Sequence, residues 1–129
     1  MKKITTLLAA LAVMLSISAY AQDIKLEDNS KILGKWKVNA EALGLDKEKK
    51  ALHVSWDFQK NGTLLTTGED SLGRTKEMDI AIKYSVENGV IKKQSSPGRE
   101  KYEECAVVEL SGKDMILKCR SLYFFLTRI

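Results

Sequence analysis

A stretch of strict alternation constrains this chain more than any other feature. Between residues 52 and 58, apolar and polar side chains alternate without exception. This period of two residues is that of a half-buried β-strand. Asn61-Gly62 follows, and this pair favours the positive φ angles of a type I′ hairpin turn. Centring the turn on this pair predicts that Phe58 lies opposite Leu65 and that Trp56 lies opposite Thr67.

The same alternation recurs along the chain and is interrupted by turn residues about every eight to twelve positions. This spacing is typical of consecutive short strands. One such segment places a run of apolar side chains on one face: Met78, Ile80, Ile82, Tyr84 and Val86. Asn88-Gly89 then turns the chain and places Val86 opposite Ile91. Further turns at 95–98 and 111–114, a closing strand at 122–128 and a first strand at 32–38 bring the expected number to about eight.

Short antiparallel strands joined by tight hairpins predict an all-β meander in one domain. An open meander leaves two unpaired edges, which closure into an up-and-down barrel removes. A two-sheet sandwich is the alternative, but its Greek-key crossings need longer connections than most of those in this chain. Residues 39–50, with Asn39 placed as a cap, predict one short helix or loop between the first two strands. Residues 68–76 are expected to form a polar loop.

The first 21 residues have the pattern of a cleaved secretory signal peptide. Lys2 and Lys3 precede an apolar run, and Ala19-Tyr20-Ala21 ends it with small residues at the two positions that a signal peptidase reads. The run is short for a hydrocarbon core of about 30 Å, and no Cys follows the junction to accept a lipid. We expect cleavage after Ala21, a mature domain of residues 22–129 without a membrane anchor, and a bacterial periplasmic or secreted destination.

The charge balance of the mature chain argues against a nucleic-acid partner. Removal of the leader takes two lysines away and leaves 108 residues with a net charge of +2. No basic stripe appears in the pattern, so the electrostatic footprint of a nucleic-acid-binding protein is missing. We expect a monomer.

The segment Ile32-Leu33-Gly34-Lys35-Trp36-Lys37-Val38 resembles the Gly-x-Trp signature on the first strand of lipocalins. In that family the Trp closes the base of the barrel and an Arg near the end of the last strand packs over it, and Arg128 stands at the matching place here. The later order of strands and turns, up to Tyr123-Phe124-Phe125, is similar to that of small secreted bacterial lipocalin-like domains. The resemblance implies an eight-stranded barrel with Gly34, Trp36 and Arg128 as its structural signature.

Catalytic, cofactor and metal sites are not expected. The lone His53 falls on the polar side of its strand, away from any partner that a general base or a metal site needs. Glu103 and Glu104 are adjacent on a strand and point to opposite faces, so they cannot act together on one bond. Lys92 and Lys93 suggest an anionic partner or, as the preferred interpretation, a solubilising face.

Cys105 and Cys119 flank a single hairpin in an exported chain, which favours a disulfide. The register that aligns Ala106, Val108 and Leu110 with Leu117 and Met115 conflicts with this, because it sets Cys105 opposite Arg120. A one-residue bulge within residues 111–113 would bring the two cysteines together. A free or intermolecularly paired Cys105 is the alternative.

The side chains expected to point into the barrel are the remaining functional candidates: Trp36, Val54, Trp56, Phe58, Ile80, Ile82, Tyr84, Val108, Leu117, Phe124 and Leu126. We predict that Trp56, Phe58, Ile82, Tyr84, Leu117 and Phe124 line a pocket for a small apolar ligand. The competing interpretation is a barrel filled by its own side chains. The alternative function is a periplasmic protein-binding module, such as an inhibitor or immunity-type protein, that acts through the loops at 39–50 and 68–76, with Leu72 and Arg74 among the contacts.

Overall fold

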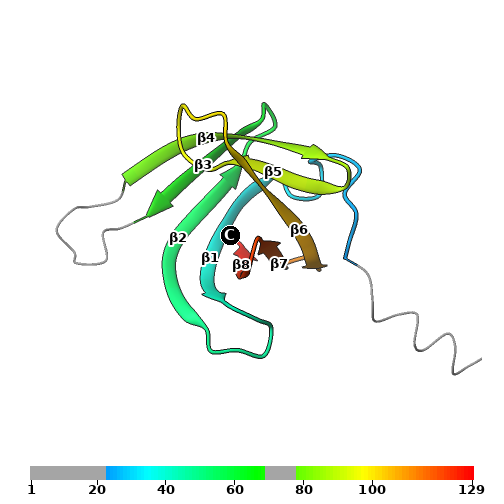
Figure 1. The fold of residues 1–129 in the computed structure, drawn as a ribbon, viewed down its shortest axis with the longest axis vertical. Helices are drawn as coiled ribbons and strands as arrows, with labels where there is room; N and C mark the ends of the chain where they lie inside the picture. Colours follow the sequence, from blue (N-terminus) through cyan, green and yellow to red (C-terminus); the bar gives the residue numbers. More distant parts are fainter. Residues whose placement is uncertain (1–22, 69–77) are drawn as a thin grey trace, which may run out of the picture.

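The computed structural model of this chain describes residues 23–68 and 78–129, which form one closed antiparallel barrel. The strands follow one another around the ring in chain order, and β1 pairs with β8 to close it (Figure 1). The strands are β1 (Gly34–Ala42), β2 (Lys50–Phe58), β3 (Thr63–Gly68), β4 (Met78–Glu87), β5 (Val90–Gln94), β6 (Tyr102–Leu110), β7 (Asp114–Cys119) and β8 (Leu122–Arg128). The predicted all-β meander barrel is confirmed, and the sandwich alternative is wrong because a single sheet closes on itself.

The connection between β1 and β2 is a loop and not a helix. Strand β1 runs on to Ala42, and residues 43–49 make turns. Asn39, expected as a helix cap, instead donates a hydrogen bond from Nδ2 to Thr127 Oγ1 of β8 over 2.7 Å. Ala40 and Ala42 are buried against the same neighbouring strand. Tertiary pairing therefore overrides the helical propensity of this segment.

Residues 69–77, which connect β3 to β4 and include Leu72 and Arg74, lie outside the described residues, as does the proposed leader. In the part of the chain that the structure describes, no helix is long and apolar enough to cross a membrane.

One predicted hairpin register is confirmed and another is wrong. Asn88 and Gly89 both have positive φ, as a type I′ turn requires, and Val86 pairs with Ile91 as expected. In the β2–β3 hairpin, by contrast, Phe58 pairs with Leu64 and not with Leu65. Here only Gly62 has positive φ, and the Gly62 amide donates to the Gln59 carbonyl, which makes a three-residue loop and shifts the register by one.

A bulge in β6 settles the cysteine pairing. The register shifts between Val107 and Glu109, so the bulge lies within the strand and not in the turn at 111–113. Val107 is consequently buried, and Val108, expected to point inward, is half-buried. Cys105 lies directly opposite Cys119, and their sulfur atoms form a disulfide. A buried disulfide of this kind is typical of proteins from an oxidising, exported environment.

Candidate ligand-binding site

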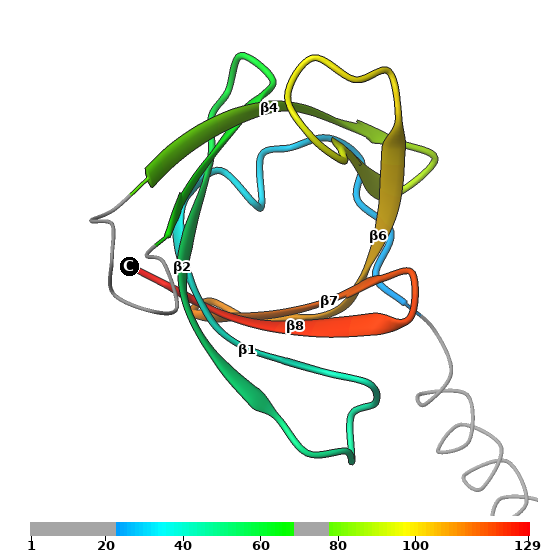
Figure 2. The ribbon, with the colours of Figure 1, turned by 60° about the vertical axis from the view of Figure 1, so that its left-hand side comes forward.

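One end of the barrel is closed by the segment that precedes β1. In Figure 2 the strands form a ring, and this blue segment crosses its opening. Ile24 bridges to Val107, and the Leu26 amide donates to the Gly89 carbonyl at the β4–β5 turn. Leu26 and Ile32 are buried against the core. No period-two signal marks this segment in the sequence, and its role as a floor was not predicted.

The predicted signature residues meet at this closed end. Trp36 is fully buried and donates from its indole Nε1 to the Ile32 carbonyl over 2.9 Å. The Arg128 guanidinium lies over the Trp36 ring and donates to the carbonyls of Leu33 and Lys31 over 2.6 and 3.0 Å. Gly34 has a φ of 109°, and a Cβ there would stand 3.2 Å from the Arg128 guanidinium. These contacts fasten the floor to β8.

Tyr84 fastens the floor to β4. Its hydroxyl donates to the Gln59 carbonyl over 2.6 Å and accepts from Asn29 Nδ2 over 3.1 Å. Burial raises the pKa of Tyr84 above its ordinary value and the charge of Asp57 adds to this, while the hydrogen bond from Asn29 acts in the opposite direction. Because its hydroxyl already has partners within the protein, Tyr84 holds the closed end of the barrel together and has no free polar group for a ligand.

The same floor segment contains a local turn at Asp28. The Asp28 carboxylate accepts from the Ser30 amide over 2.9 Å, and the hydrogen bonds from Ser30 lower the pKa of this carboxyl below its ordinary value. The turn orients Asn29 toward the barrel.

Packing divides the barrel interior into two halves. Next to the floor, the interior side chains are fully buried: Trp36, Val38, Phe58, Leu64, Ile91, Val107, Met115 and Leu117. Toward the other end, Cys105 and Cys119 are buried, but several other inward-facing side chains keep part of their surface accessible. Val54, Thr66 and Phe124 are half-buried there, and Ile80 is 37% exposed. This second half, which we call the open half, is where the interior meets solvent.

Aromatic rings form the boundary between the two halves. The Trp56 ring lies 5.4 Å from that of Phe124 and meets Phe58 edge-on at 6.3 Å, measured between centroids. Phe58 in turn stacks edge-on against Tyr84 at the floor, with 5.1 Å between centroids. Trp56 and Phe124 therefore offer an aromatic surface toward the open half.

Charged side chains also face the open half. Lys93 pairs with the buried Tyr84 across β4 and β5, so both side chains point into the barrel. Glu103 pairs with Lys93 on the same face, and the Lys93 ammonium lies 2.6 Å from its carboxylate. The interior at this level thus combines an apolar wall with an ion pair.

The structure separates the predicted pocket residues into two groups. Trp56 and Phe124 border the open half together, whereas Phe58, Tyr84 and Leu117 belong to the packed half. Ile82 is buried beside Leu64 and belongs to the packed half as well. The candidate site is accordingly smaller than the predicted one and lies nearer the open end.

Sequence reasoning favours a solubilising face for Lys93 and misses its inward position. A signal for its position exists in the chain. The predicted pairing of Val86 with Ile91 also places Lys93 opposite Tyr84, and an inward Tyr84 requires an inward Lys93. The prediction that Glu103 and Glu104 point to opposite faces is confirmed, since Glu104 is exposed and pairs with Lys92.

The other chemical candidates lie on the outer surface. His53 is exposed on β2. Lys83 and Lys92 line a surface groove of about 520 Å³ together with Tyr102. Glu103 and the two cysteines lie close to one another, but the sulfur atoms are bonded to each other and are not thiolate ligands. This cluster is therefore no metal site in the oxidised protein.

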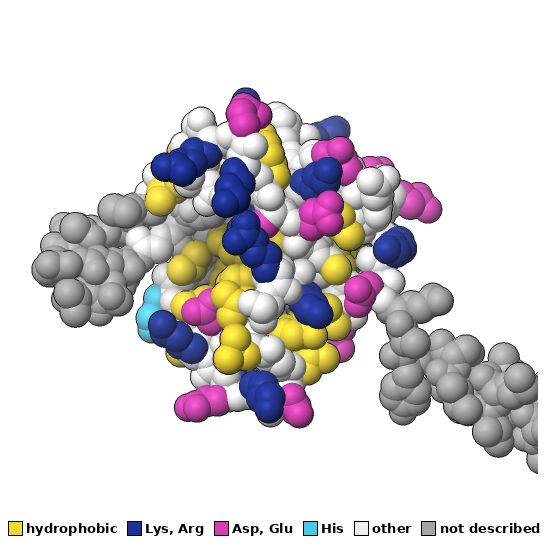
Figure 3. All heavy atoms as spheres, in the orientation of Figure 1, with side chains coloured by type: hydrophobic (Ala, Val, Ile, Leu, Met, Phe, Trp, Pro, Cys, Tyr) yellow, Lys and Arg dark blue, Asp and Glu magenta, His cyan; other side chains and the backbone are white. Residues whose placement is uncertain are grey.

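The β1–β2 hairpin extends beyond the ring of strands (Figure 2). At its tip Leu43 and Leu45 are 73% and 52% exposed. A groove of about 530 Å³ lies beside it, lined by residues 41–43 and 47–50 and by Leu122. On the face shown in Figure 3, apolar side chains gather in the middle and charged side chains surround them. The outer surface therefore also offers apolar contacts.

Comparison with known proteins supports the fold. No family model matches the sequence, and no curated protein is similar to it at a significant level. A lipocalin-like protein from Bacteroides uniformis superposes with a TM-score of 0.63 at 16% identity, over 78% of this chain and 100% of that one. An uncharacterized protein from Bacteroides eggerthii superposes with a TM-score of 0.59 at 17% identity, over 75% and 98%. The chain thus has the fold of a small lipocalin-like barrel.

Proposed function

We propose that this chain is an exported, non-enzymatic protein that binds a small apolar ligand in the open half of its barrel. The observation that supports this most is the aromatic boundary, where the half-buried Phe124 lies beside the buried Trp56, in a barrel whose other half has fully buried interior side chains. Binding sites for small molecules are concave and largely apolar, with few polar groups that fix orientation. The apolar side chains of the open half, with the Lys93–Glu103 pair beside them, match the lining that such a site needs.

The two halves have separate tasks in this proposal. The packed half and its floor supply stability and hold the ring in shape, through Trp36, Arg128 and Tyr84. The open half then does not need to be filled by side chains for the protein to fold. A ligand that covers the accessible parts of Phe124, Val54 and Ile80 gains the free energy of removing apolar surface from water, about 25 cal/mol per Å².

A binding role fits the chemistry of the described residues better than catalysis does. His53 and Glu104 face outward, away from the interior. The carboxylate of Glu103 is engaged by Lys93 and Arg120 and is therefore not free to act on a substrate. We therefore propose a carrier or sensor, without a reaction step.

Export is part of the same proposal. The leader-like residues 1–21 and the disulfide between Cys105 and Cys119 both fit an oxidising compartment. We place the mature chain, residues 22–129, in the periplasm or outside the cell.

Native mass spectrometry of protein isolated gently from the exporting cell tests this function. We expect the mass of residues 22–129, lowered by two hydrogens for the disulfide, plus a discrete small adduct. The adduct should be lost in Trp56→Ala and kept in Leu43→Ser, which changes an exposed apolar residue outside the barrel. A bare mass from every preparation, in a protein that also fails to bind the neutral apolar probe N-phenyl-1-naphthylamine, would overturn the proposal.

A second function, binding of a periplasmic protein, is favoured by the exposed β1–β2 hairpin. Leu43 and Leu45 stand at its tip without apolar cover. A stoichiometric partner that co-purifies with the wild-type chain and is lost when both leucines are changed to Ser would support this role. Retention of the partner by that variant would exclude the hairpin as the contact.

A further inference from the structure

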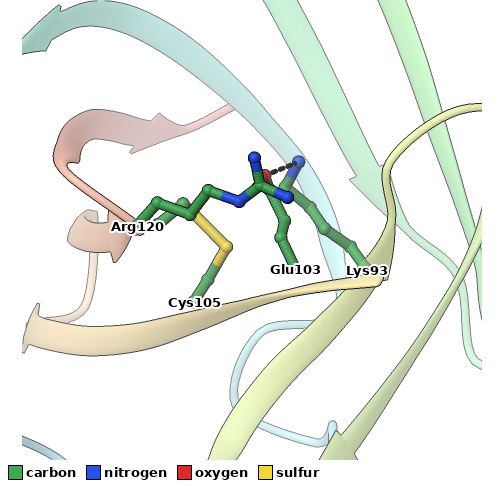
Figure 4. Close-up of a disulfide and its surroundings, with 5 residues drawn as sticks. Lys93, Glu103, Cys105 and Arg120 are labelled. Atoms are coloured by element: carbon green, nitrogen blue, oxygen red, sulfur yellow. Dashed lines mark ion pairs between the residues drawn. A yellow bond between two sulfur atoms is a disulfide. The ribbon is translucent and has the colours of Figure 1, made fainter. Parts of the chain in front are cut away.

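A cluster of three charged side chains stands at the rim of the open half. Glu103 holds Lys93 with one carboxylate oxygen, at 2.6 Å, and the Arg120 Nε with the other, at 3.6 Å. The three residues come from the end of β5, the start of β6 and the turn after β7. Figure 4 shows the Arg120 side chain reaching across the disulfide toward Glu103 and Lys93. We call these residues the rim cluster.

The rim cluster reaches into the interior through Lys93. The Lys93 ammonium lies 5.3 Å from the centroid of the Trp56 ring. Because β2 and β5 are not neighbours in the barrel, this contact spans the interior and does not run along the wall. Only 13% of the Lys93 side chain is exposed, and 18% of that of Glu103. A ligand lying against Trp56 and Phe124 therefore meets the rim cluster at one end.

The charges of the rim cluster do not balance. Two cations share a single carboxylate, so the cluster has a net charge of +1. The neighbouring charged residues Lys92, Glu104 and Lys118 lie on the outer faces of their strands, where Lys118 covers the Tyr123 ring. Within the rim cluster itself, the excess charge is therefore positive.

Arg120 is the cation that remains available. Its side chain is 59% exposed, and a guanidinium has five N–H donors arranged as a fork that fits a planar anion. Its backbone has a φ of 58°, a conformation that Gly or Asn adopts with less strain. Strained backbone conformations of this kind cluster at functional sites, which points to a role for the Arg120 side chain.

We infer that the ligand of this barrel is an amphiphile with one anionic group, its apolar body against Trp56 and Phe124 and its anion on Arg120 and Lys93. This inference rests on the proposed function and adds the class of ligand. A cationic ligand is disfavoured, because both oxygens of Glu103 are already engaged and Lys93 already lies over the Trp56 ring.

Two fluorescent probes that share one apolar body test the inference. N-phenyl-1-naphthylamine is neutral, and 8-anilino-1-naphthalenesulfonate is the same molecule with one sulfonate. We expect the disulfide-bonded mature chain to bind both probes and to bind the anionic one about tenfold more tightly at low salt, in the range of one partly exposed charge-assisted contact. The preference should decrease at high salt, because the rim is accessible to ions.

Variants of the rim cluster should move the preference in opposite directions. Arg120→Gln should bring the affinity for the anionic probe to within about twofold of that for the neutral one, since the fork donor is gone. Glu103→Gln should raise the affinity for the anionic probe severalfold, because it removes the competing carboxylate. Lys113→Gln removes an equal charge from the exposed β6–β7 turn at the opposite end and should change neither affinity.

The outcomes separate this inference from the proposed function. If the wild-type chain binds neither probe, the proposed function fails. If it binds both equally, or if Arg120→Gln and Lys113→Gln lower anion binding to the same extent, the ligand class is wrong while the apolar site stands. If Glu103→Gln and Arg120→Gln each lose binding of the anionic probe, the cluster has a structural role. This result would also overturn the inference. The affinity for the neutral probe reports in each variant whether the barrel is intact.

Discussion

The Arg128 guanidinium lies over the Trp36 indole, with 4.1 Å between Cζ and the ring centroid, and β1 and β8 pair these two residues directly. The same guanidinium donates to two carbonyls of the segment that closes the barrel. One side chain thus joins the last strand, the first strand and the floor.

Arg128→Lys should lower the free energy of unfolding by about 2 kcal/mol, because an ammonium cannot keep both carbonyls and the ring contact. Urea denaturation measures this. Arg99→Lys makes the same chemical change at an exposed position and should cost less than about 0.5 kcal/mol. Equal effects of the two substitutions would show that Arg128 does not fasten the floor.

Gly34→Ala should destabilise the barrel by about 1–3 kcal/mol, because Gly34 has a positive φ and a new Cβ would press on the Arg128 guanidinium. Gly112→Ala is the matched control, since a Cβ there meets nothing within 4 Å. Thermal or urea unfolding of the two variants compares them. A Gly34→Ala protein as stable as Gly112→Ala would contradict this account of the closed end.

The disulfide should stabilise the fold by about 3 kcal/mol, as expected for a bond between cysteines 14 positions apart. A double Cys105→Ala, Cys119→Ala variant measures the contribution in urea. Alkylation followed by intact mass measurement is the companion test. The native protein should take up no label before reduction and two labels after reduction and unfolding. Labelling of one cysteine in the unreduced protein would show that the pair is not bonded.

Stability should fall as the pH rises above about 10, and Tyr84 is the expected cause. Burial raises the pKa of Tyr84 above the ordinary value of 10.0, so the fold favours the neutral hydroxyl over the phenolate. The stabilisation is fully present below the pKa of the unfolded chain and is lost as the pH passes that of the folded protein.

Tyr84→Phe isolates this effect. It should cost about 1 kcal/mol at neutral pH through the lost hydrogen bond to Gln59, and the difference from the wild-type chain should narrow above pH 10. Urea unfolding of both proteins between pH 7 and about 11 measures it. A constant difference across this range would show that Tyr84 does not titrate differently in the folded state.

Alternation and turn residues were sufficient to predict the barrel. The pairing across Asn88-Gly89 followed from the turn chemistry alone and is confirmed. The inward positions of Trp56, Ile82 and Leu126 followed from period two, because one face of each strand is buried.

Local irregularities were beyond this reasoning. The bulge at Val108 reverses which side chains point inward along β6, and no residue there signals it. The Asn-Gly pair before Thr63 fits both the observed three-residue loop and the expected type I′ turn. The pair alone therefore does not predict which register the β2–β3 hairpin adopts. The floor depends on contacts between residues far apart in the chain, such as Leu33 with Arg128, which a local pattern does not contain.

The rim cluster was missed for a different reason. Lysine and glutamate side chains on a strand are usually solvated. This general expectation favours an outward Lys93, whereas the strand register places it inward. The register itself places Lys93 on the face of Tyr84, and the pairing of Glu103 with Lys93 continues that face. Inward charges in a strand of otherwise regular alternation are therefore worth following as candidate site residues.

The two tryptophans allow the most direct test of the proposed site. Trp36 lies at the packed, closed end and Trp56 borders the open half, so their two indole N–H signals in a ¹H–¹⁵N spectrum report on the two halves separately. Titration with N-phenyl-1-naphthylamine should shift the Trp56 signal and leave that of Trp36 unchanged. If neither signal shifts up to the solubility limit of the probe, or if only Trp36 responds, the open half is not a ligand site.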